Sequence, residues 1–189
     1  GTRAGVEVRH GSLLESHTAG GYVALIGAKV NNRGRIQTDD GAVVLAAGEK
    51  VSLPATLTQG VGVPLSSKVT LELSPSSIDT SVENGGVIVT SGGQVLLQAS
   101  SVADAVARVV HSGVIDTSGT QGGSVSVLSG NGSIQVTGSV IANSTGVGNV
   151  GGSIDIGRDP VSGALAVETN VSGATLITNK GSVETSGEV

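Results

Sequence analysis

Short runs of alternating aliphatic and polar residues recur along the chain, and each run follows a glycine. They read GGYVALIG at 20–27, GAVVLAAG at 41–48, GGQVLLQA at 92–99, GGSVSVLS at 122–129 and GGSIDIG at 151–157. An alternation with a period of two is typical of β-strands, because successive side chains then point to opposite faces. Glycine, asparagine and serine between the runs favour tight turns. We therefore predict an all-β chain of short strands joined by tight corners.

A second phrase alternates with the first and completes a repeating unit. It consists of a glycine, an aliphatic residue two positions later, and a small or polar pair. It reads GSLLES at 11–16, GRIQTD at 34–39, GVIVTS at 86–91, GVIDTS at 113–118, GSVIAN at 138–143 and GSVETS at 181–186. A single unit buries too little apolar surface to offset backbone ordering, which costs about 1–2 kcal/mol per residue. The units must therefore stack on a shared core, and this predicts a parallel β-helix (solenoid).

An antiparallel β-sandwich is the competing all-β fold. Such sandwiches usually contain aromatic core residues, whereas Tyr22 is the only aromatic residue in this chain. Small, uniform aliphatic side chains suit the stacking of like residues between successive coils. The composition therefore favours the β-helix over the sandwich.

One segment departs from the glycine phrases and predicts an insertion. Residues 54–80 hold three of the four prolines, and the alternation at 69–73 suggests an extra strand outside the helix. We expect this segment to leave the rod as a loop or hairpin. The predicted organisation is therefore β-helix coils over 1–53, an insertion over 54–80, and further coils over 81–189.

A second interruption predicts a short helix near 101–110. Its apolar residues have helical spacing, and Ser101 is a suitable N-cap. These apolar residues are Val102, Ala105, Val106 and Val109. We expect one or two helical turns to cover a lateral face of the rod.

Charge and composition exclude several classes of protein. The chain has no cysteine, so disulfides and thiolate metal sites are absent. Its net charge is −5 without a basic run, which disfavours a nucleic-acid partner. No run of 18 apolar residues occurs, so the sequence predicts no membrane insertion as a helix.

Two long segments carry a resemblance to a known family. GGYVALIGAKVNNRGRIQTDDGAVVLAAGEKVSL at 20–53 and GGVIVTSGGQVLLQASSVADAVARVVHSGVIDTSG at 85–119 resemble filamentous-haemagglutinin-like exoproteins, the passenger proteins of two-partner secretion. The resemblance implies a right-handed β-helix that a Gram-negative cell exports through an outer-membrane transporter. It implies a secreted or cell-surface location and a role as adhesin or adhesin stalk, with a host-cell surface protein or glycan as partner.

The same family leaves other roles open. Its members also include contact-dependent toxins, cytolysins and haem-acquisition exoproteins, for which this chain would be a stalk. The family's transporter-recognition region contains Asn-Pro-Asn, and no Asn-Pro pair or leader pattern occurs here. We therefore expect an interior piece of a longer exoprotein, with residues 1–53 at the end of a secretion domain.

Three patterns suggest catalysis or nucleotide binding. The stretch 146–151 matches G-x-G-x-x-G, but a strand-like segment follows it where a nucleotide site needs a helix. The stretch 116–119, echoed at 78–81, resembles the Asp-Thr-Gly of aspartic proteases, which requires two adjoining carboxylates. We expect corner roles for both. A polysaccharide-degrading β-helix enzyme would need a cluster of acidic residues. The nearest approach to such a cluster is formed by Asp155, Arg158 and Asp159, so this enzyme remains the second alternative function for the chain.

Metal ligands and modification sites complete the candidates. His10, His17 and His111 are too dispersed to predict a zinc site, and we expect them on the surface. A single GGSID at 151–155 lacks the tandem copies of calcium-binding repeats. We thus expect no catalytic residue, cofactor or metal. Three sequons make Asn131, Asn143 and Asn170 candidate glycosylation sites, with Asn143 in an apparent loop.

Overall fold

A computed structural model describes most of the chain. It covers residues 4–48, 50–52, 70–72, 79–101, 105–130, 132–145, 149, 151–157, 176–179 and 182–184. The segments 50–52, 70–72, 176–179 and 182–184 are described as backbone only.

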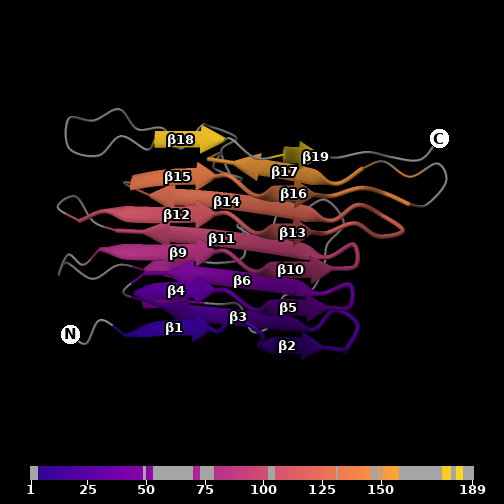
Figure 1. The fold of residues 1–189 in the computed structure, drawn as a ribbon, viewed down its shortest axis with the longest axis horizontal. Coiled ribbons are helices and arrows are strands. Elements are labelled where there is room, and N and C mark those ends of the chain that lie inside the picture. The colour runs from indigo at the N-terminus through magenta and orange to yellow at the C-terminus, as the bar shows by residue number, and fades with distance from the viewer. Residues whose placement is uncertain are drawn as a thin grey trace.

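Three parallel sheets make up most of the described structure (Figure 1). Sheet A holds β1 (Gly5–Val8), β4 (Lys29–Asn32), β9 (Thr80–Asn84), β12 (Ala107–His111), β15 (Gly132–Val136) and β18 (Leu176–Asn179). Sheet B holds β2 (Leu13–Ser16), β5 (Arg35–Thr38), β10 (Val87–Thr90), β13 (Val114–Asp116), β16 (Ser139–Ile141) and β19 (Ser182–Glu184). Sheet C holds β3 (Tyr22–Gly27), β6 (Ala42–Ala47), β11 (Gln94–Ser100), β14 (Ser124–Gly130) and β17 (Ser153–Ile156).

The chain visits the sheets in the constant order A, B, C, and each new strand pairs in parallel with its predecessor in the same sheet. We call one such passage a repeat, so β1–β3 form the first repeat and β12–β14 the fourth. The register places identical residues side by side on neighbouring strands: Ile36 pairs with Ile88, and Ile88 with Ile115. This arrangement is consistent with a parallel β-helix, and it confirms the all-β prediction and the parallel stacking of the two phrases.

The shared core draws aliphatic side chains from all three sheets. Alternate residues of each strand belong to it, as period-two alternation predicts. Its members include Val30, Val82, Val109 and Ile134 of sheet A, Ile36, Ile88, Ile115 and Val140 of sheet B, and Val43, Leu45, Val95, Leu97, Val125 and Val127 of sheet C. These side chains are at most 1% exposed, so one continuous core runs through the repeats.

Sheet C is buried on both faces over part of its area. In β6, Val43, Leu45 and Ala47 join the shared core. The alternate residues join a second buried cluster on the opposite face. That cluster contains Ala42, Val44, Ala46, Leu96 and Leu128. The six buried residues of β6 therefore form a continuous apolar run, a pattern typical of strands covered on both faces.

Glycine columns make the corners between sheets compact. A Cβ on Gly86 would collide with the backbone oxygen of Gly34, one repeat earlier, and a Cβ on Gly113 would collide with that of Gly86. Gly93 stands in the same relation to Gly41 at the next corner. The recurring glycine in both phrases thus marks places where successive backbones approach too closely for any side chain.

An antiparallel pair interrupts the repeats between β6 and β9. Its strands are β7 (Lys50–Ser52) and β8 (Thr70–Glu72), and β8 lies where the alternation at 69–73 predicts an extra strand. Most of the predicted insertion 54–80 lies outside the described residues. At its end, Thr80 already belongs to sheet A.

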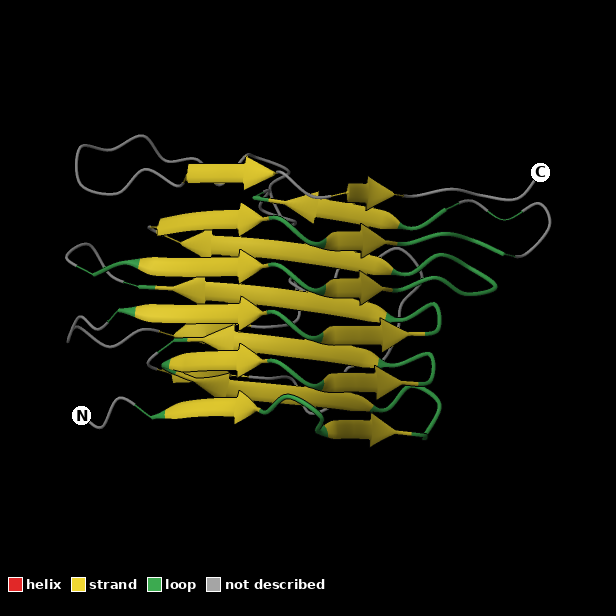
Figure 2. Cartoon of the chain, viewed as in Figure 1, coloured by secondary structure: helices red, strands yellow, loops and turns green. Residues whose placement is uncertain are grey.

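The predicted helix near 101–110 is wrong for the described part of that segment. Residues 107–111 form β12, and every described element is a strand (Figure 2). The helical spacing of four apolar residues is overridden because β12 pairs with both β9 and β15. Val106, which the helix would bury, is 58% exposed, while Ala107 and Val109 lie in the shared core.

Candidate functional site

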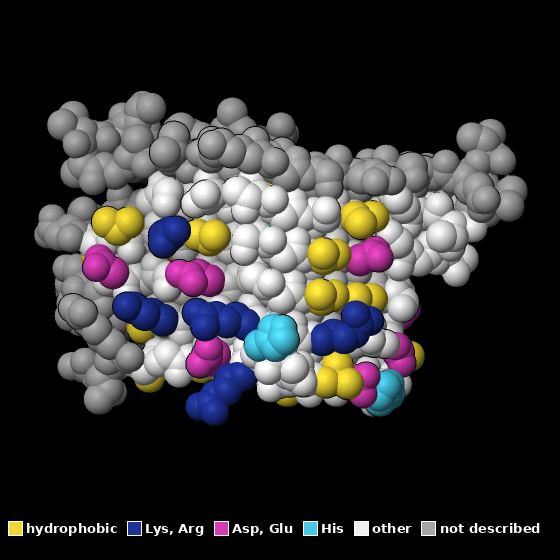
Figure 3. Space-filling model, viewed as in Figure 1, with side chains coloured by type: hydrophobic (Ala, Val, Ile, Leu, Met, Phe, Trp, Pro, Cys, Tyr) yellow, Lys and Arg dark blue, Asp and Glu magenta, His cyan; other side chains and the backbone are white. Residues whose placement is uncertain are grey.

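The outer face of sheet B presents aliphatic and charged side chains in two rows. Because Leu14, Ile36, Ile88 and Ile115 point into the core, their strand neighbours point outward. One row consists of Leu13, Arg35, Val87, Val114 and Ser139, and the other of Glu15, Gln37, Val89, Asp116 and Ile141. Figure 3 shows aliphatic side chains gathered over this sheet. Leu13 is 50% and Val114 36% exposed.

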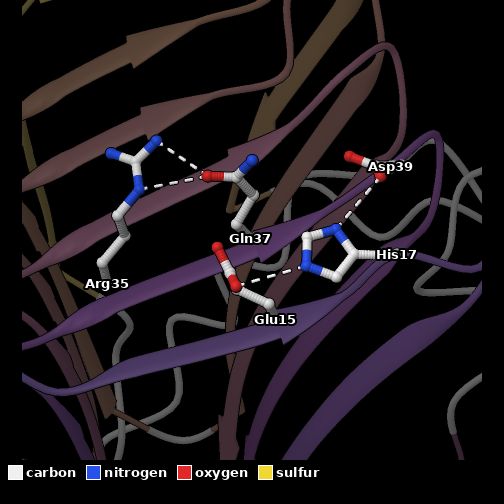
Figure 4. A network of polar contacts seen from close by, with 5 residues as sticks. All are labelled: Glu15, His17, Arg35, Gln37 and Asp39. Atoms are coloured by element: carbon white, nitrogen blue, oxygen red, sulfur yellow. Dashed lines mark hydrogen bonds and ion pairs between the residues drawn. The ribbon is translucent and has the colours of Figure 1, made fainter.

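A polar network lies at the first two strands of this face (Figure 4). Arg35 donates from Nε and Nη2 to Gln37 Oε1 at 3.2 and 3.0 Å. His17 follows β2 and stands between two carboxylates. Its Nε2 is 3.2 Å from Glu15 Oε2 and its Nδ1 is 3.5 Å from Asp39 Oδ2. The register of β2 with β5 brings these residues together, since Glu15 pairs with Gln37.

The chemistry of this network suits recognition at a surface. The side chain of His17 is 69% exposed, so its ion pairs are screened by water. Both ring nitrogens face carboxylate oxygens. Among the described residues, no group of three or more His, Asp or Glu is arranged to hold a metal ion. The network instead offers hydrogen-bonding groups of both charges beside the exposed aliphatic rows.

Sheet A presents a different outer face, with few aliphatic residues. Arg33 Nη1 lies 3.7 Å from Glu7 Oε1, and Arg108 Nη1 lies 4.0 Å from Glu83 Oε1. Figure 3 shows basic and acidic side chains mixed over this sheet. The two outer faces therefore differ in chemistry although the same repeat builds both.

A ladder of buried polar side chains lies inside the corner between sheets A and B. We call Asn32, Asn84 and His111 the polar ladder; they occupy matching register positions and are 0% exposed. Gly34 N–H donates to Asn32 Oδ1 at 3.1 Å, and Asn32 Nδ2 donates to Asn84 Oδ1 at 2.8 Å. Asn84 Nδ2 and His111 Nδ1 are 3.1 Å apart, and His111 Nε2 is 2.9 Å from the Ser139 carbonyl oxygen. Every member is thus hydrogen-bonded on both sides.

The ladder fixes the chemical state of His111. Nε2 faces a carbonyl and must carry the proton, while Nδ1 faces an amide donor and must accept. Burial lowers the pKa of His111 below 6.5, against a smaller opposing effect of the backbone groups of Ser139 and Asn84. The expectation that His111 lies on the surface is therefore wrong. His10 and His17 are exposed, as expected.

The sequence offered a signal for the ladder. Asn32, Asn84 and His111 each stand two residues before the glycine that opens the second phrase, in VNNRG, VENGG and VVHSG. Aligning these phrases places the three residues at one register position. Polar residues there face the core because the aliphatic residue two positions earlier does so as well.

The structure separates the residues of the aspartic-protease-like patterns. Asp116 ends a strand of sheet B, and its Oδ1 accepts a hydrogen bond from Ser118 N–H at 2.9 Å. Asp79 precedes sheet A, and its Oδ1 accepts one from Val106 N–H at 3.1 Å. Both carboxylates thus hold local backbone, in agreement with the corner roles predicted for them.

The remaining candidates lie partly outside the described residues. Asp155 is half-buried in β17, in register with Ser126, whereas Arg158 and Asp159 are not described. Strand β17, not a helix, follows the G-x-G-x-x-G at 146–151. Asn143 is half-buried, and its backbone N–H donates to Ser118 Oγ at 3.1 Å. Asn131 and Asn170 lie outside the described residues.

Comparison with known proteins gives no family assignment. The chain matches no protein-family model, no curated protein and no solved structure. Within the described ranges, no helix has the length and apolarity needed to cross a membrane.

Proposed function

We propose that this chain is part of a secreted, filamentous-haemagglutinin-like exoprotein, built as a right-handed β-helix, and that it acts as adhesin or adhesin stalk on the surface of a Gram-negative cell. An outer-membrane transporter of two-partner secretion exports it, and a host-cell surface protein or glycan is its partner. The proposal assigns the chain no catalytic step. It rests on the family resemblance of segments 20–53 and 85–119 and on the repeated A, B, C order of the strands.

One observation carries the binding role. The outer face of sheet B exposes Leu13 and Val114 in a single register row with Arg35, beside the network around His17. Exposed aliphatic side chains with neighbouring charged groups are typical of protein interaction surfaces. The face is a sheet, so its side chains keep fixed positions without the ordering cost that a loop would add on binding.

The test measures binding of the purified chain to cultured host cells and to a glycan array. The double variant Leu13→Ser/Val114→Ser removes the two exposed aliphatic side chains, and Val106→Ser is the matched control because Val106 is exposed outside sheet B. We expect the double variant to lose at least about tenfold in affinity, the equivalent of 1.4 kcal/mol, and the control to bind as the parent does.

Other outcomes separate the alternatives. If the parent binds and the double variant binds equally well, the face of sheet B is not the contact surface. If the parent binds neither cells nor glycans, the adhesin role is wrong for this segment. The stalk of a contact-dependent toxin, cytolysin or haem-acquisition exoprotein then takes its place.

A further inference from the structure

The direction of the polar ladder is fixed by its two ends. Gly34 N–H can only donate and the Ser139 carbonyl can only accept. Between them, each amide must accept on the side of Gly34 and donate on the side of Ser139. The ring of His111 must likewise accept at Nδ1 and donate at Nε2. One arrangement alone satisfies all the members, and it requires a neutral imidazole.

A proton on Nδ1 of His111 breaks this chain of side-chain hydrogen bonds. It would face Asn84 Nδ2, which is also a donor. If the Asn84 amide turned over to offer its oxygen, its Nδ2 would face Asn32 Nδ2. If Asn32 turned as well, its Nδ2 would face Gly34 N–H. Whichever way the amides turn, two donors are left facing each other inside the core, and this destabilises the protonated form.

The surroundings of His111 provide no compensating charge. Strands β9, β11, β14 and β15 pack against β12. Their inward side chains are uncharged, namely Thr80, Val82 and Asn84 of β9, Val95, Leu97 and Ala99 of β11, Val125, Val127 and Ser129 of β14, and Ile134 and Val136 of β15. The charged residues of β9 and β12, Glu83 and Arg108, lie on the outer face and pair with each other at 4.0 Å.

We propose that the polar ladder is an acid-sensitive joint: a proton gained at His111 breaks the hydrogen-bond chain that links β4, β9 and β12 inside the core. Val8 and Val136 occupy the register positions below and above the ladder, so no further side chain of this column extends it. The joint therefore acts at one place, between the second and fourth repeats.

The direction of the pH effect follows from linkage. The pKa of His111 is lower in the folded chain than the ordinary 6.5 that it regains on unfolding. Above pH 6.5 both states are neutral and the ladder contributes fully. As the pH falls below 6.5, His111 becomes protonated in the unfolded chain while it stays neutral in the folded chain. The free energy of unfolding therefore decreases. The decline ends where the folded chain also becomes protonated at His111.

The first test measures urea unfolding from pH 7.5 to pH 5 for the parent and for His111→Asn. Asparagine is the natural residue at this register position in β4 and β9, and it does not titrate. We expect the ratio of the parent's folding constant to that of His111→Asn to fall by up to about tenfold per pH unit below 6.5. His10→Gln, which alters an exposed histidine outside both the polar ladder and the network around His17, is the control and should keep the decline that His111 causes.

The second test uses the unmodified chain, so it does not depend on the folding of any variant. Nuclear magnetic resonance of the imidazole nitrogens should show His111 in the folded chain as the neutral tautomer, with the proton on Nε2 and none on Nδ1. If His111 carries its proton on Nδ1, or is already doubly protonated in the folded chain at pH 6.5, the proposal is overturned. It is equally overturned if His111→Asn keeps the parent's full pH dependence.

Discussion

Two corners of the same repeat hold buried polar columns, and only one of them is fully hydrogen-bonded. At the corner between sheets A and B, the polar ladder joins Asn32, Asn84 and His111 without an unpaired group. At the corner between sheets B and C, Thr38 and Thr90 stack in register and are also 0% exposed. Their hydroxyl oxygens have no hydrogen-bond partner. The two columns are therefore equally buried and equally in register, yet one is fully hydrogen-bonded and the other contains unpaired hydroxyls.

The difference lies in the reach of the side chains. Parallel strands stack about 4.8 Å apart, so a group must offer an acceptor toward one neighbour and a donor toward the other to bridge that distance. An amide or a neutral imidazole has its two functions on separate atoms. A hydroxyl has its donor and its acceptor on the same oxygen, so it cannot reach the hydroxyl of the next repeat. Thr117, the next residue of this column, instead donates to the Ile141 carbonyl at 3.2 Å.

Both corners depend on their glycine columns, and substitution there should have the largest effect. Gly86→Ala places a Cβ against the backbone oxygen of Gly34, which already accepts the Val87 N–H at 2.9 Å and cannot move away freely. We expect a loss of about 3 kcal/mol or more in urea unfolding. Gly85→Ala is the matched control, because its Cβ would lie 3.5 Å from Ser112 Oγ in ordinary contact. Equal losses for the two variants would show that backbone freedom, not close approach, decides the effect.

Breaking the polar ladder at its centre should have the next largest effect. Asn84→Ala leaves Asn32 Nδ2 and His111 Nδ1 without partners in the core and opens a small cavity. We expect unfolding in urea at pH 7.5 to show a loss of about 2–3 kcal/mol. Asn31→Ala, on the outer face of β4, should change stability by less than about 0.5 kcal/mol. A small loss for Asn84→Ala would mean that water enters the corner and replaces the amide.

The contrast between the columns also shows which features the sequence could predict. The aliphatic residue of the second phrase, Ile36, Ile88 or Ile115, faces the core as the alternation predicts. That alternation says which face a residue occupies, and it would have placed His111 inside had the phrases been aligned. It could not show whether the buried group finds a partner, because this depends on the spacing between repeats and the reach of the side chain.

Other features of the structure could not be predicted from the sequence, each for a different reason. The helical spacing near 101–110 spans too few residues to outweigh pairing on both edges of β12. The second buried cluster on sheet C appears in β6 as an unbroken apolar run, which periodicity alone does not distinguish from other buried segments. The third such feature is the contact of His17 with Glu15 and Asp39. Glu15 lies in β2, His17 follows β2 and Asp39 follows β5, so the register of the two strands brings the three residues together.

Removing the unpaired hydroxyls of the threonine column should raise the stability of the chain, whereas the substitutions above lower it. Thr38→Val and Thr90→Val keep the branched shape and delete a buried oxygen without a partner, so each should stabilise the chain by about 1 kcal/mol. Thr117→Val is the control, since it loses the hydrogen bond with Ile141 and should destabilise. Urea unfolding of the three variants measures both signs. A loss of stability for Thr38→Val and Thr90→Val would contradict the account of this column.

The smallest effect is expected on the outside of the strands that carry the ladder. Arg108 and Glu83 lie on β12 and β9, the strands that also carry His111 and Asn84, but their side chains are 52% and 42% exposed. Water and salt screen this pair, so Arg108→Ala should change stability by less than about 0.5 kcal/mol, and the change should shrink further in 1 M salt. The loss from Asn84→Ala should persist in the same salt, because no solvent reaches the ladder. If 1 M salt reduced the stability losses of Arg108→Ala and Asn84→Ala by the same factor, the difference between the two contacts could not be explained by burial.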